Sequence, residues 1–350
     1  MIAAAERFLL KLAAAALLAG AATLGIAQTV PGPADGALPS SPVRIEVAAR
    51  AIDAFDAADA RQLRFGALEF RGGLELTSNF KRFGGISGLR VMPDGERFIA
   101  ASDRGQWLRG RIVYKGDKPA GIADAEMAPM LGPDGRVLTD RKWYDTESVA
   151  DDGAGHVYVG IERVNRIVRF DLGHAGLVAR GRPVPVPEGV ATLPRNEGLE
   201  CLAAIPKGMP DAGALIAISE RGLDAAGNLR SFVIGGHAPG EFSVVRSNDF
   251  NATDCVVAPD ANLFLLERRF SWSQGIAMRI RRFPLAALVR GATLEGQVLM
   301  TADMGFQIDN MEALGAHRDR RGNIVLTLMS DDNFSVLQRT LLLQFAVADE

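Results

Sequence analysis

Short apolar stretches alternate with turns rich in Asp, Gly, Asn and Pro along most of the chain, and this pattern recurs five times. In each repeat a small or acidic residue precedes the first apolar stretch, and an acid follows the second. Two short apolar runs joined by such a turn predict a β-hairpin. The five repeats are Ile86–Gly105, Thr146–Arg163, Asn196–Gly222, Ala252–Arg269 and Asn310–Asn333.

The repeats follow one another at intervals of roughly 50 to 60 residues, a length typical of a four-stranded β-propeller blade with long loops. A helical solenoid is disfavoured, because the segments between the hairpins hold glycine, proline and β-branched residues instead of long apolar stripes of helical period. Leu63–Thr77 alternates in strand fashion and can pair with Leu341–Val347, which would close the ring. We therefore predict an all-β fold with a single β-propeller of six blades, with five blades as the alternative.

The N-terminus has the pattern of a signal peptide. Arg7 and Lys11 precede the apolar run Leu12–Ala27, and the small residues Gly25 and Ala27 suit a signal-peptidase site. The run is short for a membrane span, which needs about 20 residues, although an uncleaved anchor stays the alternative. The sequence thus predicts a signal peptide over 1–27, a linker over 28–42 and a propeller domain over 43–350. It also predicts export to the periplasm or beyond.

Composition narrows the choice of partners. The apolar fraction is 48%, charged residues make up 23% and the formal net charge is -3. Without a basic patch, nucleic acid and anionic membrane surfaces are poor partners, so we expect a small-molecule ligand. Cys201 and Cys255 are the two cysteines of the chain. They either form one disulfide or stay buried free thiols, and the sequence alone leaves both open.

Acidic residues recur at the ends of the predicted hairpins. A hairpin brings the start of its first strand beside the end of its second, so both sets of acids should surround one mouth of the central channel. The positions before the first strands are Ser87, Glu147, Glu197, Asp254 and Glu312. Those after the second strands are Asp103, Glu162, Glu220, Glu267 and Asp331. Crowded carboxylates repel one another and attract a hard cation, which predicts a Ca²⁺ site.

Arginine follows four of the acids at the ends of the second strands, at Arg104, Arg163, Arg221 and Arg268. Forked guanidinium donors suit an anionic substrate oxygen such as that of phosphate. In the competing structural interpretation, each arginine pairs with acids of its own or the next blade. A Ser-His-Asp hydrolase is disfavoured, because none of the four histidines lies among the acids.

Several motifs resemble the phytase-like family, whose members are described as having esterase-like activity of phytase. They are FGGISGL (83–89), SDRG (102–105), NEGLE (196–200), LLERRFS (265–271), DNMEAL (309–314) and SDDNFS with QRTLLLQF (330–345). The resemblance implies hydrolysis of carboxylic or phosphate esters, with a metal ion and arginines stabilising the developing charge. By this resemblance Glu147, Glu197, Asp254 and Glu312 would be catalytic. Arg104, Arg163, Arg221 and Arg268 would bind substrate, and Asp103, Glu162, Glu220, Glu267 and Asp331 would bind the metal.

Two other functions remain open at this stage. A lactonase of the gluconolactonase kind would hold one divalent ion through a Glu, an Asn and an Asp, and Glu147, Asn196 and Asp254 offer such a set. A non-catalytic propeller would bind a ligand or protein partner through the same face. The fold alone does not choose among them, because propellers host enzymes and scaffolds alike.

Overall fold

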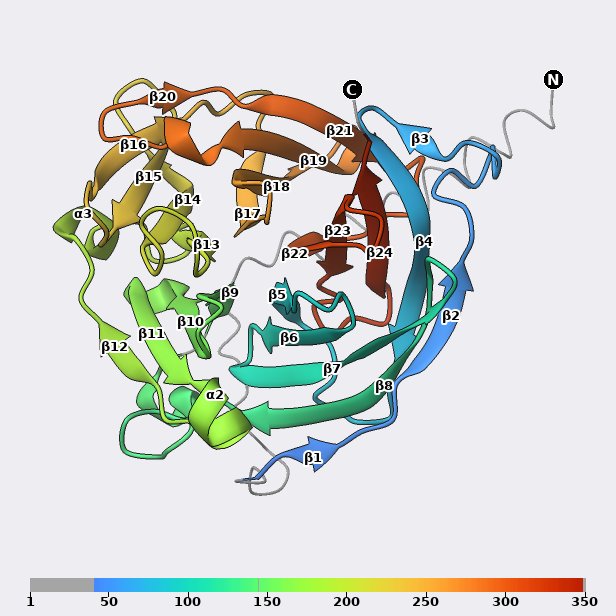
Figure 1. The fold of residues 1–350 in the computed structure, drawn as a ribbon, viewed down its shortest axis with the longest axis horizontal. Coiled ribbons are helices and arrows are strands. Elements are labelled where there is room, and N and C mark those ends of the chain that lie inside the picture. Colours follow the sequence, from blue (N-terminus) through green and yellow to red (C-terminus); the bar gives the residue numbers. More distant parts are fainter. Residues whose placement is uncertain (1–40, 144, 349–350) are drawn as a thin grey trace. The chain divides into compact units, whose positions relative to one another are not determined.

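The computed structural model describes residues 41–143 and 145–348. The predicted signal peptide (1–27) and most of the predicted linker lie outside the described residues. The strands form five sheets arranged around a central axis, each with its innermost strand beside that axis (Figure 1). The predicted single β-propeller is therefore confirmed, and the described chain has the alternative count of five blades.

The first two blades follow the predicted hairpins closely. In the first blade the strands, from the axis outward, are β5 (Ile86–Val91), β6 (Arg97–Ser102), β7 (Gln106–Lys115), β8 (Lys118–Pro129) and β1 (Val43–Arg44). In the second they are β9 (Thr146–Asp151), β10 (His156–Ile161), β11 (Arg166–Asp171) and β12 (Arg182–Val184). All six residues of β5 are buried, as expected for the strand that faces the axis.

The third and fourth blades use the next two repeats. The third holds β13 (Leu199–Ala204), β14 (Leu215–Leu223), β15 (Leu229–Ile234), β16 (Gly240–Val244) and β20 (Thr293–Leu294). The fourth holds β17 (Asn251–Val257), β18 (Asn262–Ser271), β19 (Gly275–Pro284) and β21 (Gln297–Asp303). The short strand β20 pairs in parallel with β16, so the chain between β19 and β21 covers the edge of the preceding blade.

The fifth blade joins the two ends of the domain. Its strands are β22 (Met311–Arg318), β23 (Ile324–Ser330), β24 (Thr340–Val347), β4 (Leu68–Thr77) and β2 (Ala48–Ile52), with β3 (Arg64–Phe65) paired to β4. The predicted pairing between the N-terminal segment and the C-terminal run is confirmed by the β4–β24 register, which joins Leu74 to Leu342. Because β4 extends the sheet of the last repeat, no sixth blade forms in the described chain.

The helices among the described residues are few and short. They are α2 (Leu172–Ala175), α3 (Glu188–Ala191), η1 (Leu138–Arg141), η2 (Glu162–Val164), η3 (Gly176–Val178) and η4 (Leu285–Ala287). In the part of the chain that the structure describes, no helix has the length and apolar character needed to cross a membrane.

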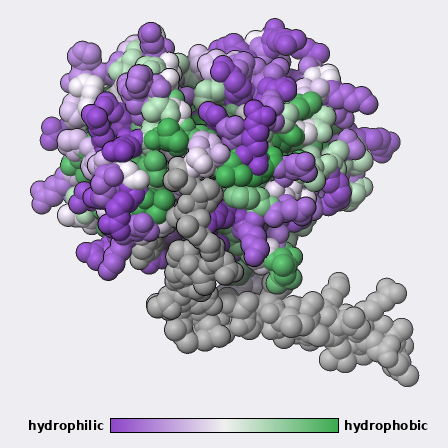
Figure 2. All heavy atoms as spheres, turned by 90° about the horizontal axis from the view of Figure 1, so that it is seen from below, coloured by the Kyte–Doolittle hydropathy of each residue, from purple (hydrophilic) through white to green (hydrophobic). Residues whose placement is uncertain are grey.

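The hydrophobic core is divided among the blade interfaces. Buried apolar residues form five clusters, and each cluster lies between two neighbouring sheets, including the pair formed by the fifth and first blades. Hydrophilic side chains predominate on the side of the molecule shown in Figure 2, with smaller apolar patches between them. Packing of every blade against the next stabilises the ring and leaves no open seam among the described residues.

One disulfide and one arginine link blades near the axis. Cys201 of β13 and Cys255 of β17 form a disulfide, which decides between the two alternatives that the sequence left open. Arg90 of β5 crosses the axis below the mouth. Its Nη1 donates to the carbonyl oxygen of Leu314 at 2.7 Å, and its Nη2 donates to those of Leu202 at 2.6 Å and Cys255 at 2.7 Å. A single side chain therefore bonds to strands of the third, fourth and fifth blades.

Candidate functional site

Each innermost strand carries a β-bulge at the same place, where its register with the second strand shifts by one residue. A bulge leaves one residue unpaired and redirects its side chain. The unpaired residues are Ser87, Glu147, Glu200, Thr253 and Glu312, and we call them the inner ring. Three glutamates and two hydroxyl residues thus occupy equivalent positions around the mouth of the channel.

A second set of side chains comes from the ends of the second strands. In every blade the register places one residue opposite the start of the innermost strand, for example Ser102 opposite Ile86 and Glu267 opposite Ala252. The next residue along the chain reaches the mouth. These residues are Asp103, Glu162, Glu220, Arg268 and Asp331, and we call them the outer ring. Four acids and one arginine therefore lie beside the inner ring.

Loss of hydration and mutual repulsion make the two rings difficult to ionise fully. The pKa values of Glu147 and Glu200 are raised well above the ordinary glutamate value, first by burial and then by neighbouring carboxylates. Glu162 and Glu312 raise the pKa of both, and these four glutamates belong to the second, third and fifth blades. The charges of at least three blades therefore act on one small volume.

The pKa values of the outer-ring acids are raised by different amounts. Burial raises the pKa of Asp103 to about 6 and those of Glu162 and Glu220 to about 7. The pKa of Asp331 reaches about 8, because burial is reinforced by the charges of Asp103 and of an inner-ring glutamate. Near neutral pH these carboxyl groups are thus unequal in their ability to hold a proton.

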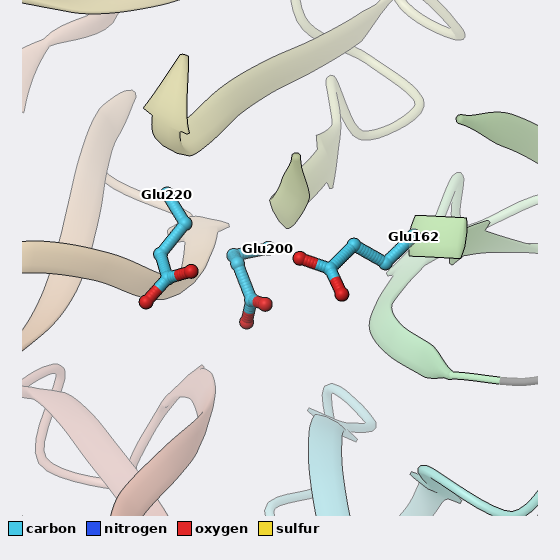
Figure 3. Close-up of side chains that lie close together, drawn as sticks. All are labelled: Glu162, Glu200 and Glu220. Carbon is cyan, nitrogen blue, oxygen red and sulfur yellow. The ribbon is translucent and has the colours of Figure 1, made fainter. Parts of the chain in front are cut away.

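Three glutamates come closest together. Ligand oxygens of Glu162, Glu200 and Glu220 all lie within 4.8 Å of one another. Figure 3 shows the carboxylate of Glu200 between those of the other two. The backbone N–H of Gly198 donates a hydrogen bond to Oε1 of Glu162 at 3.0 Å. Three carboxylate oxygens at this spacing suit a hard cation such as Ca²⁺.

Arg268 is the one cation of the two rings. Its Nε lies 3.2 Å from Oε1 of Glu312, and this carboxylate is the largest of several charges that raise the arginine's pKa. The charges of Glu220 and Asp331 also contribute. Seven acids, three from the inner ring and four from the outer ring, therefore face one guanidinium group.

Three predicted acids lie elsewhere than the repeats suggested. Glu267 is completely buried, and its two oxygens accept hydrogen bonds from Arg279 and Arg281 of β19. Its neighbour Arg268 occupies the equivalent position in the outer ring. The alignment of this repeat was wrong by one residue, which turns a strand side chain to the opposite face of the sheet.

The same one-residue slip affects Asp254. Thr253 takes the inner-ring position, and Asp254 is fully buried below it, with Oδ2 3.1 Å from Nη1 of Arg90 and Oδ1 3.2 Å from Nη2. Its carboxylate also accepts hydrogen bonds from the backbone N–H groups of Cys255 and Leu314, both at 2.8 Å. Because these bonds occupy its oxygens, Asp254 is unsuited to a metal ion, and the lactonase-type set that includes it is not assembled.

Glu197 lies at the rim, where its Oε1 accepts a hydrogen bond from Arg221 at 2.7 Å and its side chain is 40% exposed. Glu200, three residues later, occupies the inner ring instead. The local pattern does not distinguish the two, because a leucine stands two positions after each, Leu199 after Glu197 and Leu202 after Glu200.

The four predicted substrate-binding arginines have different surroundings. Arg163 pairs with Asp145 and Arg221 pairs with Glu197, both at the rim. Arg104 lies over the ring of Phe334, with its guanidinium carbon 3.4 Å from the ring centroid. Together with Arg268 in the outer ring, all four are on the predicted face. The structural interpretation, in which each arginine pairs with acids of its own or the next blade, describes Arg163, Arg221 and Arg268.

The raised pKa values predict a pH-dependent stability. Ordinary carboxyl groups of the unfolded chain ionise near pH 4, whereas Asp103, Glu162 and Asp331 ionise in the folded protein near pH 6, 7 and 8. The folded state therefore loses stability as the pH rises through this range. In excess EDTA, we expect Tm to fall by roughly 5 °C or more between about pH 5 and pH 8.5. Differential scanning calorimetry measures this, and Asp331→Asn should reduce the fall. A Tm that rises over the range would contradict the electrostatics described here.

Comparison with known proteins shows which family the chain belongs to. The sequence profile of a family described as phytase-like, with esterase-like activity of phytase, matches residues 81–334. No curated protein matches the chain. A solved structure of the dihydro-heme d1 dehydrogenase NirN is similar with 14% identity and a TM-score of 0.33, over 77% of this chain and 49% of that chain. The α-L-arabinofuranosidase PaAbf62A from Podospora anserina is similar with 12% identity and a TM-score of 0.48, over 80% of this chain and 97% of that chain. This chain thus spans about half the length of the first of these proteins.

Proposed function

Because the chain belongs to the phytase-like family, described by its esterase-like activity, we propose that it is a metal-assisted hydrolase of ester or phosphoester bonds. The carboxylate excess at the mouth supports this most directly, since seven acids face the single guanidinium of Arg268. Such an excess is stable at neutral pH only if protons or a cation neutralise part of it. The fold agrees with a hydrolase but does not by itself select one.

In this proposal Glu162, Glu200 and Glu220 hold the cation. Their oxygens are close enough for one ion, and hard oxygen donors suit Ca²⁺ better than a soft metal. The bound ion would supply positive charge that polarises the ester oxygen and stabilises the charge developing there. Arg268, whose charge acts on Glu220, would orient the same substrate group with its forked donors.

Two outer-ring acids suit proton transfer in this proposal. Asp331, with a pKa of about 8, is protonated at neutral pH and can donate a proton to a leaving group. Asp103, with a pKa of about 6, is mostly ionised and can accept one. Neighbouring carboxyl groups whose pKa values are driven apart commonly divide the roles of acid and base.

The proposed place of action is the periplasm or the exterior. The disulfide between Cys201 and Cys255 supports this, because such bonds persist in oxidising compartments and are rare where thiols are kept reduced. The predicted signal peptide over 1–27 agrees with it. Cell fractionation of the full-length chain in a bacterial host checks this proposal, and a product that keeps residues 1–27 and stays in the cytoplasm would contradict it.

A thermal melt tests the metal site. We expect millimolar Ca²⁺ to raise Tm of the 28–350 protein relative to excess EDTA, since an ion at 100 times its Kd adds about 2.7 kcal/mol to the free energy of unfolding. Glu200→Gln should remove most of this shift, because its carboxylate lies between the other two. Glu197→Gln at the rim should keep the shift and serves as the matched control.

The same samples decide between the candidate functions. No shift with Ca²⁺, Mg²⁺ or Mn²⁺ would contradict the proposal and favour a non-catalytic propeller. If the shift is present, release of 4-nitrophenol from 4-nitrophenyl phosphate or 4-nitrophenyl acetate supports a hydrolase of phosphate or carboxylic esters. Ring opening of a lactone without hydrolysis of either ester would instead favour a lactonase.

A further inference from the structure

A second hollow lies beside the carboxylate rings, on the same face of the propeller. Its volume is about 610 Å³, and it is bounded by residues of the second blade and by the segment that enters the third. Three arginines line it, namely Arg163, Arg166 and Arg195, together with Trp143 and Asn165. We call it the arginine pocket. Its volume is in the range of pockets that bind small organic ligands, roughly 300–1,000 Å³.

Two of these arginines keep their charge available. Arg166 and Arg195 are exposed, and no carboxylate lies within ion-pair distance of either among the residues that the structure describes. Arg166 lies over the ring of Trp143, with its guanidinium carbon 5.3 Å from the centroid. Arg163, in contrast, is bound to Asp145. The arginine pocket therefore has two unneutralised positive charges beside a strongly negative cluster.

The short helix η2 connects the arginine pocket to the carboxylate rings. Glu162 begins this helix and reaches the outer ring, whereas Arg163 and Val164 line the pocket. The turn is held at its end by Asn165, whose Nδ2 donates to the carbonyl oxygen of Leu193 at 2.6 Å. A ligand in the pocket would thus lie next to the glutamate that contributes to the proposed metal site.

We propose that the arginine pocket binds an oxyanion of the substrate, a phosphate or carboxylate group separate from the ester bond that is cleaved. This inference rests on the proposed function for its substrate, although the pocket can be tested by itself. An anionic ligand would be repelled by the seven acids without a distinct positive site, and Arg166 and Arg195 provide one. Guanidinium groups match the planar, two-oxygen edge of such anions.

The remaining surface of the pocket indicates the rest of the ligand. Trp143 gives the pocket apolar surface, and the guanidinium carbons of Arg141 and Arg166 lie 4.9 and 5.3 Å from its ring centroid. The volume exceeds what a bare phosphate or carboxylate needs. We therefore expect an organic anion with a ring or chain attached, so that the charged group binds in the pocket and the ester reaches the mouth.

Equilibrium titration tests the proposal with three probes: inorganic phosphate, phenyl phosphate and benzoate. Binding is measured by isothermal titration calorimetry at low salt, with protein that has been stripped of divalent ions by EDTA and then dialysed free of it, so that neither the metal site nor the chelator contributes. We expect phenyl phosphate or benzoate to bind, and the double variant Arg166→Gln/Arg195→Gln to bind it roughly tenfold or more weakly, because charge-assisted hydrogen bonds are lost. Arg182→Gln is the matched control, since Arg182 is exposed on β12 of the same blade outside the pocket.

The outcomes separate this inference from the proposed function. If none of the probes binds, or if the double variant binds as tightly as the wild type, the arginine pocket is not an anion site. A loss of affinity as large in Arg182→Gln would also overturn it, because the effect would then be one of net charge. Thermal melts with Ca²⁺ on the same double variant report on the metal site alone, so that a retained calcium shift with lost anion binding supports the pocket assignment.

Discussion

Replacement of Arg90 by methionine is expected to lower the free energy of unfolding by about 3–5 kcal/mol, the typical cost of breaking a buried ion pair from one side. The variant leaves the carboxyl group of Asp254, whose pKa burial already raises to about 6, buried and without its cation. It also removes the donors for the carbonyl oxygens of Leu202, Cys255 and Leu314. Strands of three blades lose hydrogen bonds through the loss of one side chain.

Guanidinium chloride unfolding followed by circular dichroism measures this effect. Arg97→Met is the matched control, because Arg97 pairs with Asp94 on the surface, where exposed ion pairs contribute about 1 kcal/mol or less. Arg90→Met/Asp254→Leu should recover part of the loss, since it removes the unpaired charge as well. Equal stability of Arg90→Met and Arg97→Met would contradict the role of Arg90 as a link across the axis.

Loss of the disulfide is expected to have an effect of similar size. The bond between Cys201 and Cys255 closes a loop with a sequence separation of 54 residues. On the loop-entropy relation, such a cross-link stabilises the folded state by about 4 kcal/mol. Both cysteines are completely buried between the third and fourth blades, so the pair Cys201→Ala/Cys255→Ala also loses packing there.

The test compares the unfolding midpoint of the wild type with and without dithiothreitol. We expect the reduced protein to unfold at a clearly lower denaturant concentration. The double alanine variant is the control for the reductant, because dithiothreitol should leave its midpoint unchanged. If reduction does not shift the midpoint of the wild type, the disulfide does not stabilise the fold, and the blade interface alone holds this part of the ring.

Arg90 and the disulfide between Cys201 and Cys255 both stabilise the scaffold that carries the carboxylate rings. Seven acids near one arginine destabilise the folded state at neutral pH when no cation is bound, as the raised pKa values indicate. Arg90 and the disulfide lie close to the axis and link the first, third, fourth and fifth blades, which together carry five of the seven acids. A rigid scaffold of this kind is what a site of mutually repelling groups requires.

Much of the fold follows from the sequence pattern. Five hairpins with polar turns, repeated at a blade-like interval, predict a propeller because each hairpin can bury its apolar residues only against its neighbours. Strand patterns near both ends predict ring closure, as the β4–β24 pairing confirms. The blade count does not follow from the pattern, because Leu63–Thr77 shows that a strand exists but not which sheet it joins.

The position of each acid required the tertiary structure. The pattern shows that acids recur near the hairpin ends. Successive side chains of a strand point to opposite faces, so a register error of one residue places a side chain in the interior that was expected at the mouth. The sequence therefore determined that this chain forms a ring of β-blades with acids at the hairpin ends. Only the packed structure decided that Glu200 and Arg268 reach the mouth while Asp254 and Glu267 bind arginines inside, because the bulges that turn these side chains depend on pairing between strands.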